Sequence, residues 1–111
     1  MASKYNNKKT KIDDLTFDSR KEAREYLRLK ALQDRGDITG LRLHVKFDFK
    51  INDEYLRYVD SKRVIKYVAD FEYFDLYGSR KIVDVKGVKT RDYLIKKALM
   101  LSVHGILVEE V

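Results

Sequence analysis

A strict alternation of apolar and charged side chains runs through the middle of the sequence. In LRLHVKFDFK, residues 41–50, every odd-numbered residue is apolar and every even-numbered residue is charged or a histidine. Successive side chains of a β-strand point to opposite faces, so the pattern predicts a strand with one buried face. Such a strand requires partners, and the chain is therefore expected to form a sheet around it.

Two further β segments follow and are predicted to pair as an antiparallel hairpin. Residues 63–75 are rich in Val, Ile, Tyr and Phe, residues 81–88 alternate in a similar way, and LYGS between them is typical of a turn. A last short strand is expected over residues 106–111.

Two helices are predicted around these strands. Ser19 and Glu22 have the spacing of a capping box, so a helix is expected to begin near Ser19 and to end at Gly36. Thr90 is expected to cap a second helix that ends at His104 and Gly105. The order helix, strand, strand, strand, helix, strand indicates an α/β fold, a mixed sheet flanked by helices.

The length and composition indicate one ionic domain. The chain has 111 residues, enough for a single hydrophobic core, and we expect one domain over residues 16–111. Residues 1–15 are expected to form a basic, flexible arm. Cysteine is absent, which excludes disulfides and thiolate metal sites, and two histidines argue against zinc. Without a long apolar run or a signal peptide, a soluble cytoplasmic protein is expected, with no membrane partner.

The charge balance favours a polyanionic partner, nucleic acid before an anionic membrane surface. Lys and Arg number 24 against 18 Asp and Glu, a net charge of +6. Two clusters are expected to contact the phosphate backbone of DNA, although the second also fits a solvated helix face. They comprise Lys8, Lys9 and Lys11 in the arm, and Lys89, Arg91, Lys96 and Lys97 around the start of the second helix.

Two carboxylates in the hairpin suggest a site. Asp70 interrupts the apolar run VADF, where an ionised carboxylate is costly to bury without a partner. Asp84 lies fourteen positions later on the partner strand, with Lys86 on the same face. A hairpin turning near Gly78 brings the two aspartates together, and paired carboxylates suit Mg²⁺, for which Mn²⁺ is the expected substitute. The competing interpretation is an ordinary salt-bridged pair of Asp84 and Lys86 on an exposed face.

The other candidates also have structural interpretations. Glu22 fits a capping-box partner of Ser19, but it shares a helix side with Tyr26 that is expected to face the sheet. Glu25 is the alternative helix carboxylate. His44 is interpreted as a surface residue of its strand, less readily as a neighbour of the site.

The residues Asp70 and DVKG at 84–87, following a helix that begins FDSRKEA at residues 17–23, resemble the PD-(D/E)XK nuclease superfamily. The chain resembles in particular a short phage-encoded family related to Holliday-junction resolvases and restriction-type endonucleases. Ala69 stands where the superfamily name places proline. The resemblance implies a restriction-endonuclease-like core in which Glu22, Asp70, Asp84 and the carbonyl of Val85 hold the metal ion. Lys86 would then act on the attacking water or the scissile phosphate.

The expected function is therefore a Mg²⁺-dependent endonuclease acting on branched or structured DNA, as a homodimer because junction resolution needs two symmetric cuts. One alternative is a non-catalytic nucleic-acid-binding module with the nuclease fold. Another is an RNA- or protein-interaction domain, which would require an exposed stacking surface formed by tyrosines. The tyrosines considered are Tyr55, Tyr58, Tyr67, Tyr73 and Tyr77.

Overall fold

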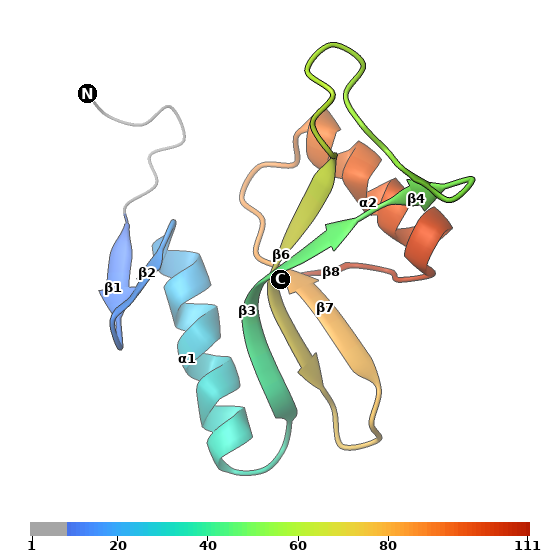
Figure 1. Cartoon of the computed structure of the whole chain (residues 1–111). Helices are drawn as coiled ribbons and strands as arrows, with labels where there is room; N and C mark the ends of the chain where they lie inside the picture. Colours follow the sequence, from blue (N-terminus) through green and yellow to red (C-terminus); the bar gives the residue numbers. More distant parts are fainter. Residues whose placement is uncertain (1–8) are drawn as a thin grey trace.

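The computed structural model describes residues 9–111 (Figure 1). Lys8 and the rest of residues 1–8 of the predicted arm lie outside the described residues. The two helices of the described chain are α1 (Arg20–Asp34) and α2 (Arg91–His104). The strands are β1 (Thr10–Ile12), β2 (Leu15–Phe17), β3 (Thr39–Asp48), β4 (Lys50–Ile51), β5 (Glu54–Tyr55), β6 (Lys66–Phe74), β7 (Arg80–Asp84) and β8 (Glu109–Glu110).

The central sheet of the described chain contains four strands in the order β3-β6-β7-β8. β6 pairs antiparallel with both β3 and β7, whereas β8 pairs parallel with β7. The sheet is therefore mixed, and the fold is α/β with two helices in the described residues, as the sequence predicts. The element order differs from the prediction, because two strands precede α1 and the short β4–β5 pair lies between β3 and β6.

The end of the predicted flexible arm has regular structure. β1 and β2 pair antiparallel, with Thr10 opposite Phe17. Phe17 is fully buried and packs on Tyr26 of α1, with 5.1 Å between ring centroids. Burial of this aromatic ring attaches the hairpin to the helix, so the described part of residues 1–15 is largely a hairpin.

The strand bounds are shorter than predicted at the end of the β6–β7 hairpin. β7 ends at Asp84, and residues 85–90 form a loop that leads to α2. β8 covers Glu109–Glu110 of the expected 106–111. Beyond the Phe71–Val83 pair, aspartate side chains take the place of the β6–β7 backbone ladder: Asp84 accepts from Asp70 N at 3.0 Å and Asp70 accepts from Val85 N at 2.8 Å.

The helices begin and end close to where the sequence predicts. Ser19 caps α1 and accepts a hydrogen bond from the backbone N–H of Glu22 at 3.1 Å. Thr90 caps α2 in the same way, accepting from Tyr93 N. Gly105 ends α2 in the left-handed conformation at φ 68°. Side-chain caps satisfy N–H groups that the helix itself leaves unpaired, which is why these residues fix the boundaries.

The helices cover opposite faces of the sheet, and each covers a different half. Ile82 packs in the core cluster of α2 and its neighbour Val83 in that of α1. Along β3, Leu43 packs with the α1 cluster, but Val45 packs with the α2 cluster. Because both are odd-numbered, the strand must exchange its faces between them. The intervening His44 adopts a left-handed backbone, φ 52°, which accounts for the exchange.

The same exchange occurs on the neighbouring strand. Ala69 belongs to the α2 cluster and Phe71 to the α1 cluster, with Asp70 between them. Phe71 lies opposite Leu43 and Ala69 opposite Val45, so His44 and Asp70 lie across from each other. Asp70 therefore lies where the helix that packs on the sheet changes from α1 to α2, and its side chain lines a pocket there.

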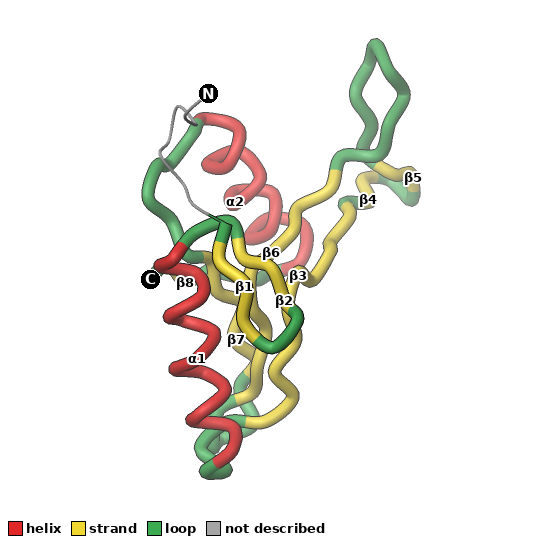
Figure 2. The backbone as a smooth tube through the Cα atoms, turned by 90° about the vertical axis from the view of Figure 1, so that its left-hand side faces the viewer, coloured by secondary structure: helices red, strands yellow, loops and turns green. Residues whose placement is uncertain are grey.

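Residues 50–65 form an arm that projects away from the body of the molecule (Figure 2). β4 and β5 pair antiparallel around Asn52 and Asp53, which have φ of 55° and 65°. Leu56 and Ile65 pack against the α2 cluster at the base. Beyond them, Tyr58 N donates to Arg63 O at 2.9 Å, which continues the two-stranded arm.

Candidate functional site

Asp70, in the middle of β6, lies beside Asp84, the last residue of β7. Phe71 pairs with Val83, so the next residues along each strand are these two aspartates. The backbone N–H of Asp70 donates to Asp84 Oδ1 at 3.0 Å, and the N–H of Val85 donates to Asp70 Oδ2 at 2.8 Å. The register predicted from the turn near Gly78 is therefore confirmed in placing these carboxylates next to each other.

Asp84 is completely buried, on the α2 side of the sheet. Its Oδ2 accepts a hydrogen bond from the hydroxyl of Tyr67, and Lys86 Nζ lies 3.7 Å from the same oxygen. Lys86 Nζ also sits 4.3 Å from the ring centroid of Tyr93. The pairing of Asp84 with Lys86 is thus an interaction of a buried carboxylate, not a pair on an exposed face.

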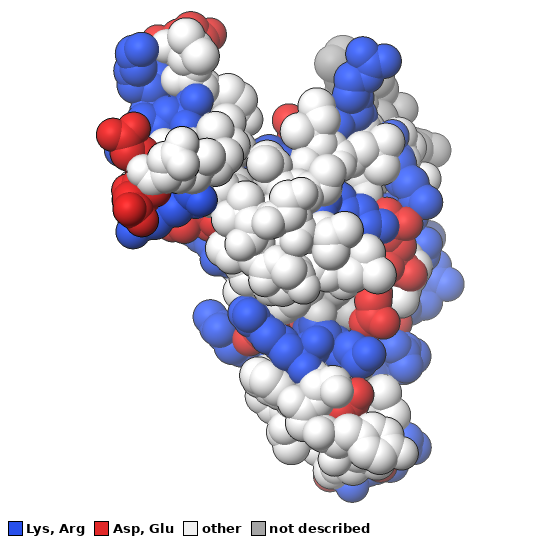
Figure 3. Space-filling model, turned by 90° about the vertical axis from the view of Figure 1, so that its right-hand side faces the viewer, with Lys and Arg blue, Asp and Glu red and all other residues white. Residues whose placement is uncertain are grey.

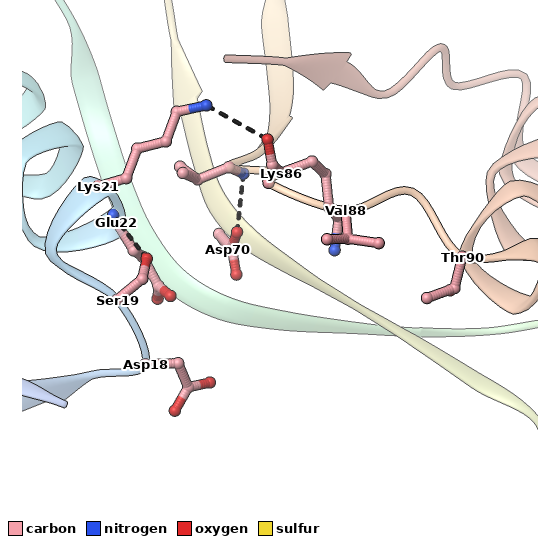
Figure 4. A pocket seen from close by; sticks show the side chains of 10 residues that line it. Asp18, Ser19, Lys21, Glu22, Asp70, Lys86, Val88 and Thr90 are labelled. Carbon is pink, nitrogen blue, oxygen red and sulfur yellow. Dashed lines mark hydrogen bonds between the residues drawn. The ribbon is translucent and has the colours of Figure 1, made fainter. Parts of the chain in front are cut away.

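A pocket of about 360 Å³ opens between the N-terminus of α1 and the loop after β7 (Figure 4). Glu22 enters from α1, Asp70 from β6 and Lys86 from the loop. Asp84 is not among the lining residues and lies beneath them. The pocket lining is Asp18, Ser19, Lys21, Glu22, Asp70, Val85, Lys86, Gly87, Val88 and Thr90.

The helix carboxylate in this pocket is Glu22. Its side chain is buried, and Oε1 lies 3.3 Å from Nε2 of His44. The capping-box partner bond back to Ser19 is replaced by an interaction with the backbone of Asp18. Glu25 instead forms a two-bond ion pair with Arg28 on the next turn, at 2.8 and 2.7 Å. Glu22 and Glu25 are thus about one helical turn apart, and only Glu22 reaches the pocket.

The pocket carboxylates are electrostatically linked. Burial raises the pKa of Asp70 to about 7, and the negative charges of Asp84 and Glu22 add to this rise. The Val85 hydrogen bond and the charge of Lys86 oppose it. Burial likewise raises the pKa of Glu22, against a lowering influence of His44. Four carboxylates line the pocket or lie beneath it, those of Asp18, Glu22, Asp70 and Asp84, against the two ammonium groups of Lys21 and Lys86, an arrangement that favours binding of a positive ion.

Sequence reasoning gave too little weight to one residue of this site and missed another. His44 was interpreted as a surface residue, and it is exposed as predicted. The less favoured interpretation, a neighbour of the site, also applies, because Nε2 lies 3.3 Å from Oε1 of Glu22. Lys21 was not considered, yet its ammonium group donates to the carbonyl oxygen of Lys86 at 3.3 Å. Strand alternation gave no signal for His44, because its left-handed backbone interrupts that alternation. The position of Lys21 near the site could have been inferred from the helix cap, because Lys21 precedes Glu22 in the first turn of α1.

The second predicted basic cluster is largely charge-compensated. Lys89 and Lys97 both pair with Glu110 of β8, at 2.9 and 3.3 Å, and Lys96 pairs with Asp92 at 3.4 Å. Hydrogen bonds from Lys89, Tyr93 and Lys97 lower the pKa of Glu110 to about 2. Arg91 is exposed. In the predicted arm, Lys9 is exposed, and Lys11 lies on β1 at 4.0 Å from Asp14.

The tyrosines do not form one stacking surface. Tyr67 is buried between Phe47 and Tyr93, whereas Tyr77 lies in the β6–β7 turn. Tyr55 and Tyr58 are exposed on the arm, and Tyr73 is half-buried. The arrangement that an RNA- or protein-interaction domain would require is absent for these five described residues.

The residues of the pocket fit a hard divalent cation in donor chemistry. In residues 9–111 no group of three or more His, Cys, Asp or Glu side chains is arranged as a metal site. Mg²⁺, however, commonly takes one or two protein carboxylates and completes its shell with water and phosphate oxygens. Glu22 and Asp70 supply such a pair at the pocket wall, whereas both oxygens of Asp84 already contact protein donors.

The chain belongs to the family described as "Protein of unknown function (DUF1064)", whose match covers residues 2–105. The match includes both helices and every residue of the pocket. Comparisons with curated proteins and with solved structures gave no match. Neither helix in the described residues is long and apolar enough to cross a membrane.

Proposed function

We propose that this protein is a metal-dependent endonuclease that hydrolyses phosphodiester bonds of branched or structured DNA, such as Holliday junctions, on a restriction-endonuclease-like core. The observation that supports it most is the adjacency of Asp70 and Asp84 on two paired strands, with Lys86 beside them and Glu22 across the pocket. Lys86 of the D-V-K segment and the helix carboxylate Glu22 line one pocket, which supports the proposal of a PD-(D/E)XK-type nuclease.

The proposed roles follow from where each group lies. Glu22, Asp70 and the carbonyl of Val85 would hold Mg²⁺, or Mn²⁺ in its place, at the pocket wall. A bound ion of this kind polarises a phosphoryl oxygen and lowers the pKa of a bound water. Asp84 fixes Asp70 through its backbone N–H and holds the ammonium group of Lys86. We therefore assign Asp84 the role of positioning Asp70 and Lys86. Asp84 could bind the metal ion only after one of its oxygens loses its hydrogen bond to the protein.

Lys86 is the cation best placed to meet a phosphate. Its side chain is partly exposed at the pocket, anchored by Asp84 on one side and by the face of Tyr93 on the other. Both contacts limit the motion of the ammonium group. A fixed ammonium group neutralises charge that develops on the scissile phosphate without reorganising at the moment of reaction.

A twofold homodimer is part of the proposal, because two symmetric cuts require two sites. The outward side of α2 supports it: Leu94, Ile95 and Leu101 are each about half exposed. Figure 3, which faces the side of the molecule where α2 lies, shows a broad uncharged area across the middle. A helix that is apolar on both sides is typical of one buried in an assembly.

A cleavage assay tests the function. Wild type and Asp84→Asn would be incubated with labelled four-way junction and linear duplex, with Mg²⁺, Mn²⁺ or a chelator. We expect cutting that requires the metal, prefers the junction and falls at least about 100-fold in the variant. Arg28→Gln, which alters an exposed pair outside the pocket, is the matched control. Cutting that persists in the chelator would contradict the proposal.

The second candidate is a nucleic-acid-binding module without catalysis. It is favoured by one observation, the complete engagement of Asp84 by Tyr67, Lys86 and the Asp70 backbone. Binding of the junction in the chelator, with no cutting under either metal at any protein concentration, would support this candidate over the first.

A further inference from the structure

One half of a sheet face has no helix over it, and it leads away from the pocket. On β6, Tyr67 and Ala69 pack in the α2 cluster, so the alternate residues Lys66 and Val68 point to the opposite face. Asp70 is the next residue of that alternation and lies at the pocket. The row therefore runs from the pocket along β6 for about 13 Å, at roughly 3.3 Å per residue.

The neighbouring strand contributes a second row. Lys46 of β3 lies opposite Val68, and Asp48 lies opposite Lys66. Lys46 and Lys66 are exposed, and neither forms an ion pair in the described chain. Val68 is 44% exposed although it belongs to an interior strand of the sheet. This strip, basic with one apolar residue at its centre, stays open because α1 begins only at Arg20 and α2 covers the other face.

The projecting arm continues this strip beyond the body of the molecule. Figure 2 shows β3 and β6 extending into the arm, which rises to one side of β1, β2 and α1. Near its end the arm carries Arg57, Lys62 and Arg63 against the single acid Asp60. The guanidinium of Arg57 donates to the carbonyl of Lys62 at 2.8 Å, which fixes the turn.

The cations of this strip differ in one respect from those around α2. Lys89, Lys96 and Lys97 are each within 3.4 Å of a carboxylate. A phosphate that binds them must compete with a partner already in place, whereas Lys46 and Lys66 form no ion pair in the described residues, although Asp48 lies opposite Lys66. Free cations gain more from a polyanion, because each phosphate contact releases a counterion without breaking an ion pair.

We propose that the open half of the β3–β6 face, with Lys46 and Lys66, is the surface that binds the phosphate backbone of duplex DNA, and that the 50–65 arm extends it. This inference rests on the proposed function and names the part of the molecule along which the substrate lies. The duplex runs from the pocket over Val68 toward Arg57 and Arg63. The basic residues of α2 contribute long-range attraction only.

Binding measured without cleavage tests the inference. The probe is a fluorescently labelled linear duplex of about twenty base pairs, titrated with the full chain in chelator at several NaCl concentrations. Lys46→Gln/Lys66→Gln is compared with Lys30→Gln/Arg35→Gln at the far end of α1, which changes the net charge equally. We expect the first pair to weaken binding about tenfold and to lower the slope of log K against log salt by about 2. The control is expected to change affinity less than twofold.

A second pair of variants locates the surface. Arg57→Gln/Arg63→Gln is expected to weaken binding, and Lys89→Gln/Lys97→Gln to leave the salt slope unchanged. Equal effects of the strip and control variants, or a larger effect of the α2 variant, would overturn the inference. In that case a wild type that still cuts DNA leaves the proposed function intact. A wild type that binds no duplex or junction even at 50 mM salt would overturn both.

Discussion

Asp70 and Asp84 share a reciprocal backbone arrangement: Asp84 accepts from the N–H of Asp70, and Asp70 accepts from the N–H that follows Asp84 in the chain. Each carboxylate therefore fixes the strand that carries the other. The arrangement is electrostatically unfavourable, because the two like charges of Asp70 and Asp84 lie close together at the pocket. Burial and this repulsion raise the pKa of Asp70 to about 7.

The first prediction concerns stability against pH. Asp70 has a pKa near 3.9 in an unfolded chain and about 7 in the fold, so between these values the folded state binds more protons. The free energy of unfolding is then expected to fall as pH rises from about 4 to about 7. Asp70→Asn removes this loss, and we expect it to raise the Tm by about 5 °C or more at pH 8 but little at pH 4. Thermal melts followed by circular dichroism measure this.

The matched control is Asp53→Asn. Asp53 lies in the exposed β4–β5 turn with a left-handed backbone that asparagine also tolerates. It is expected to melt like wild type at both pH values. If Asp70→Asn were less stable than wild type at pH 8, the excess of negative charge in the pocket would be refuted.

The second prediction concerns divalent cations. An ion that binds the folded chain raises its Tm by mass action, and the surplus charge of Glu22 and Asp70 supplies the attraction. At 10 mM MgCl₂ or MnCl₂ and constant ionic strength, we expect a Tm increase of a few degrees for wild type and for Asp53→Asn. The increase is expected to vanish in Asp70→Asn. An equal increase in all three proteins would show that the ion acts elsewhere.

The third prediction compares the buried hydrogen bond of Asp84 with a partly buried hydrogen bond of the same kind. Tyr67→Phe keeps the ring between Phe47 and Tyr93 but removes the hydroxyl that donates to Asp84. We expect a loss of about 1.5–3 kcal/mol, because a buried carboxylate loses a donor. Tyr93→Phe removes a bond to Glu110, which keeps Lys89 and Lys97, so a smaller loss than for Tyr67→Phe is expected. Urea unfolding compares the two, and equal losses would contradict the argument.

The sequence predicted the elements that depend on local chemistry. Ser19 and Thr90 cap helices through their own side chains, and Gly105 ends α2 with a positive φ, so these boundaries follow from neighbouring residues. The adjacency of Asp70 and Asp84 also follows from a short turn, since a hairpin fixes its own register. Both predictions needed no knowledge of distant contacts.

The features that sequence reasoning missed depend on long-range packing. Glu110 compensates Lys89 and Lys97 only because β8 returns parallel to β7, and nothing near those lysines indicates it. β3 exchanges its buried face at His44 because α1 and α2 pack on opposite sides of the sheet. The regular alternation of residues 41–50 gives no sign of this exchange. For this reason the sequence pointed to the lysines around α2 as the DNA-binding cations, whereas the fold leaves Lys46 and Lys66 as the cations without an ion pair in the described residues.

The last prediction concerns assembly. Leu94 and Leu101 lie seven residues apart on α2, hence on one side of the helix, and both are about half exposed. If this side joins two copies in a twofold dimer, glutamate at both positions places four charges in the interface and should disperse it. We expect wild type to sediment as a dimer and Leu94→Glu/Leu101→Glu as a folded monomer. Leu76→Glu, at a leucine 72% exposed in the β6–β7 turn, is expected to remain dimeric. A monomeric wild type at 100 μM would refute the interface, and cleavage of a junction by such a monomer would require the two cuts to be made independently.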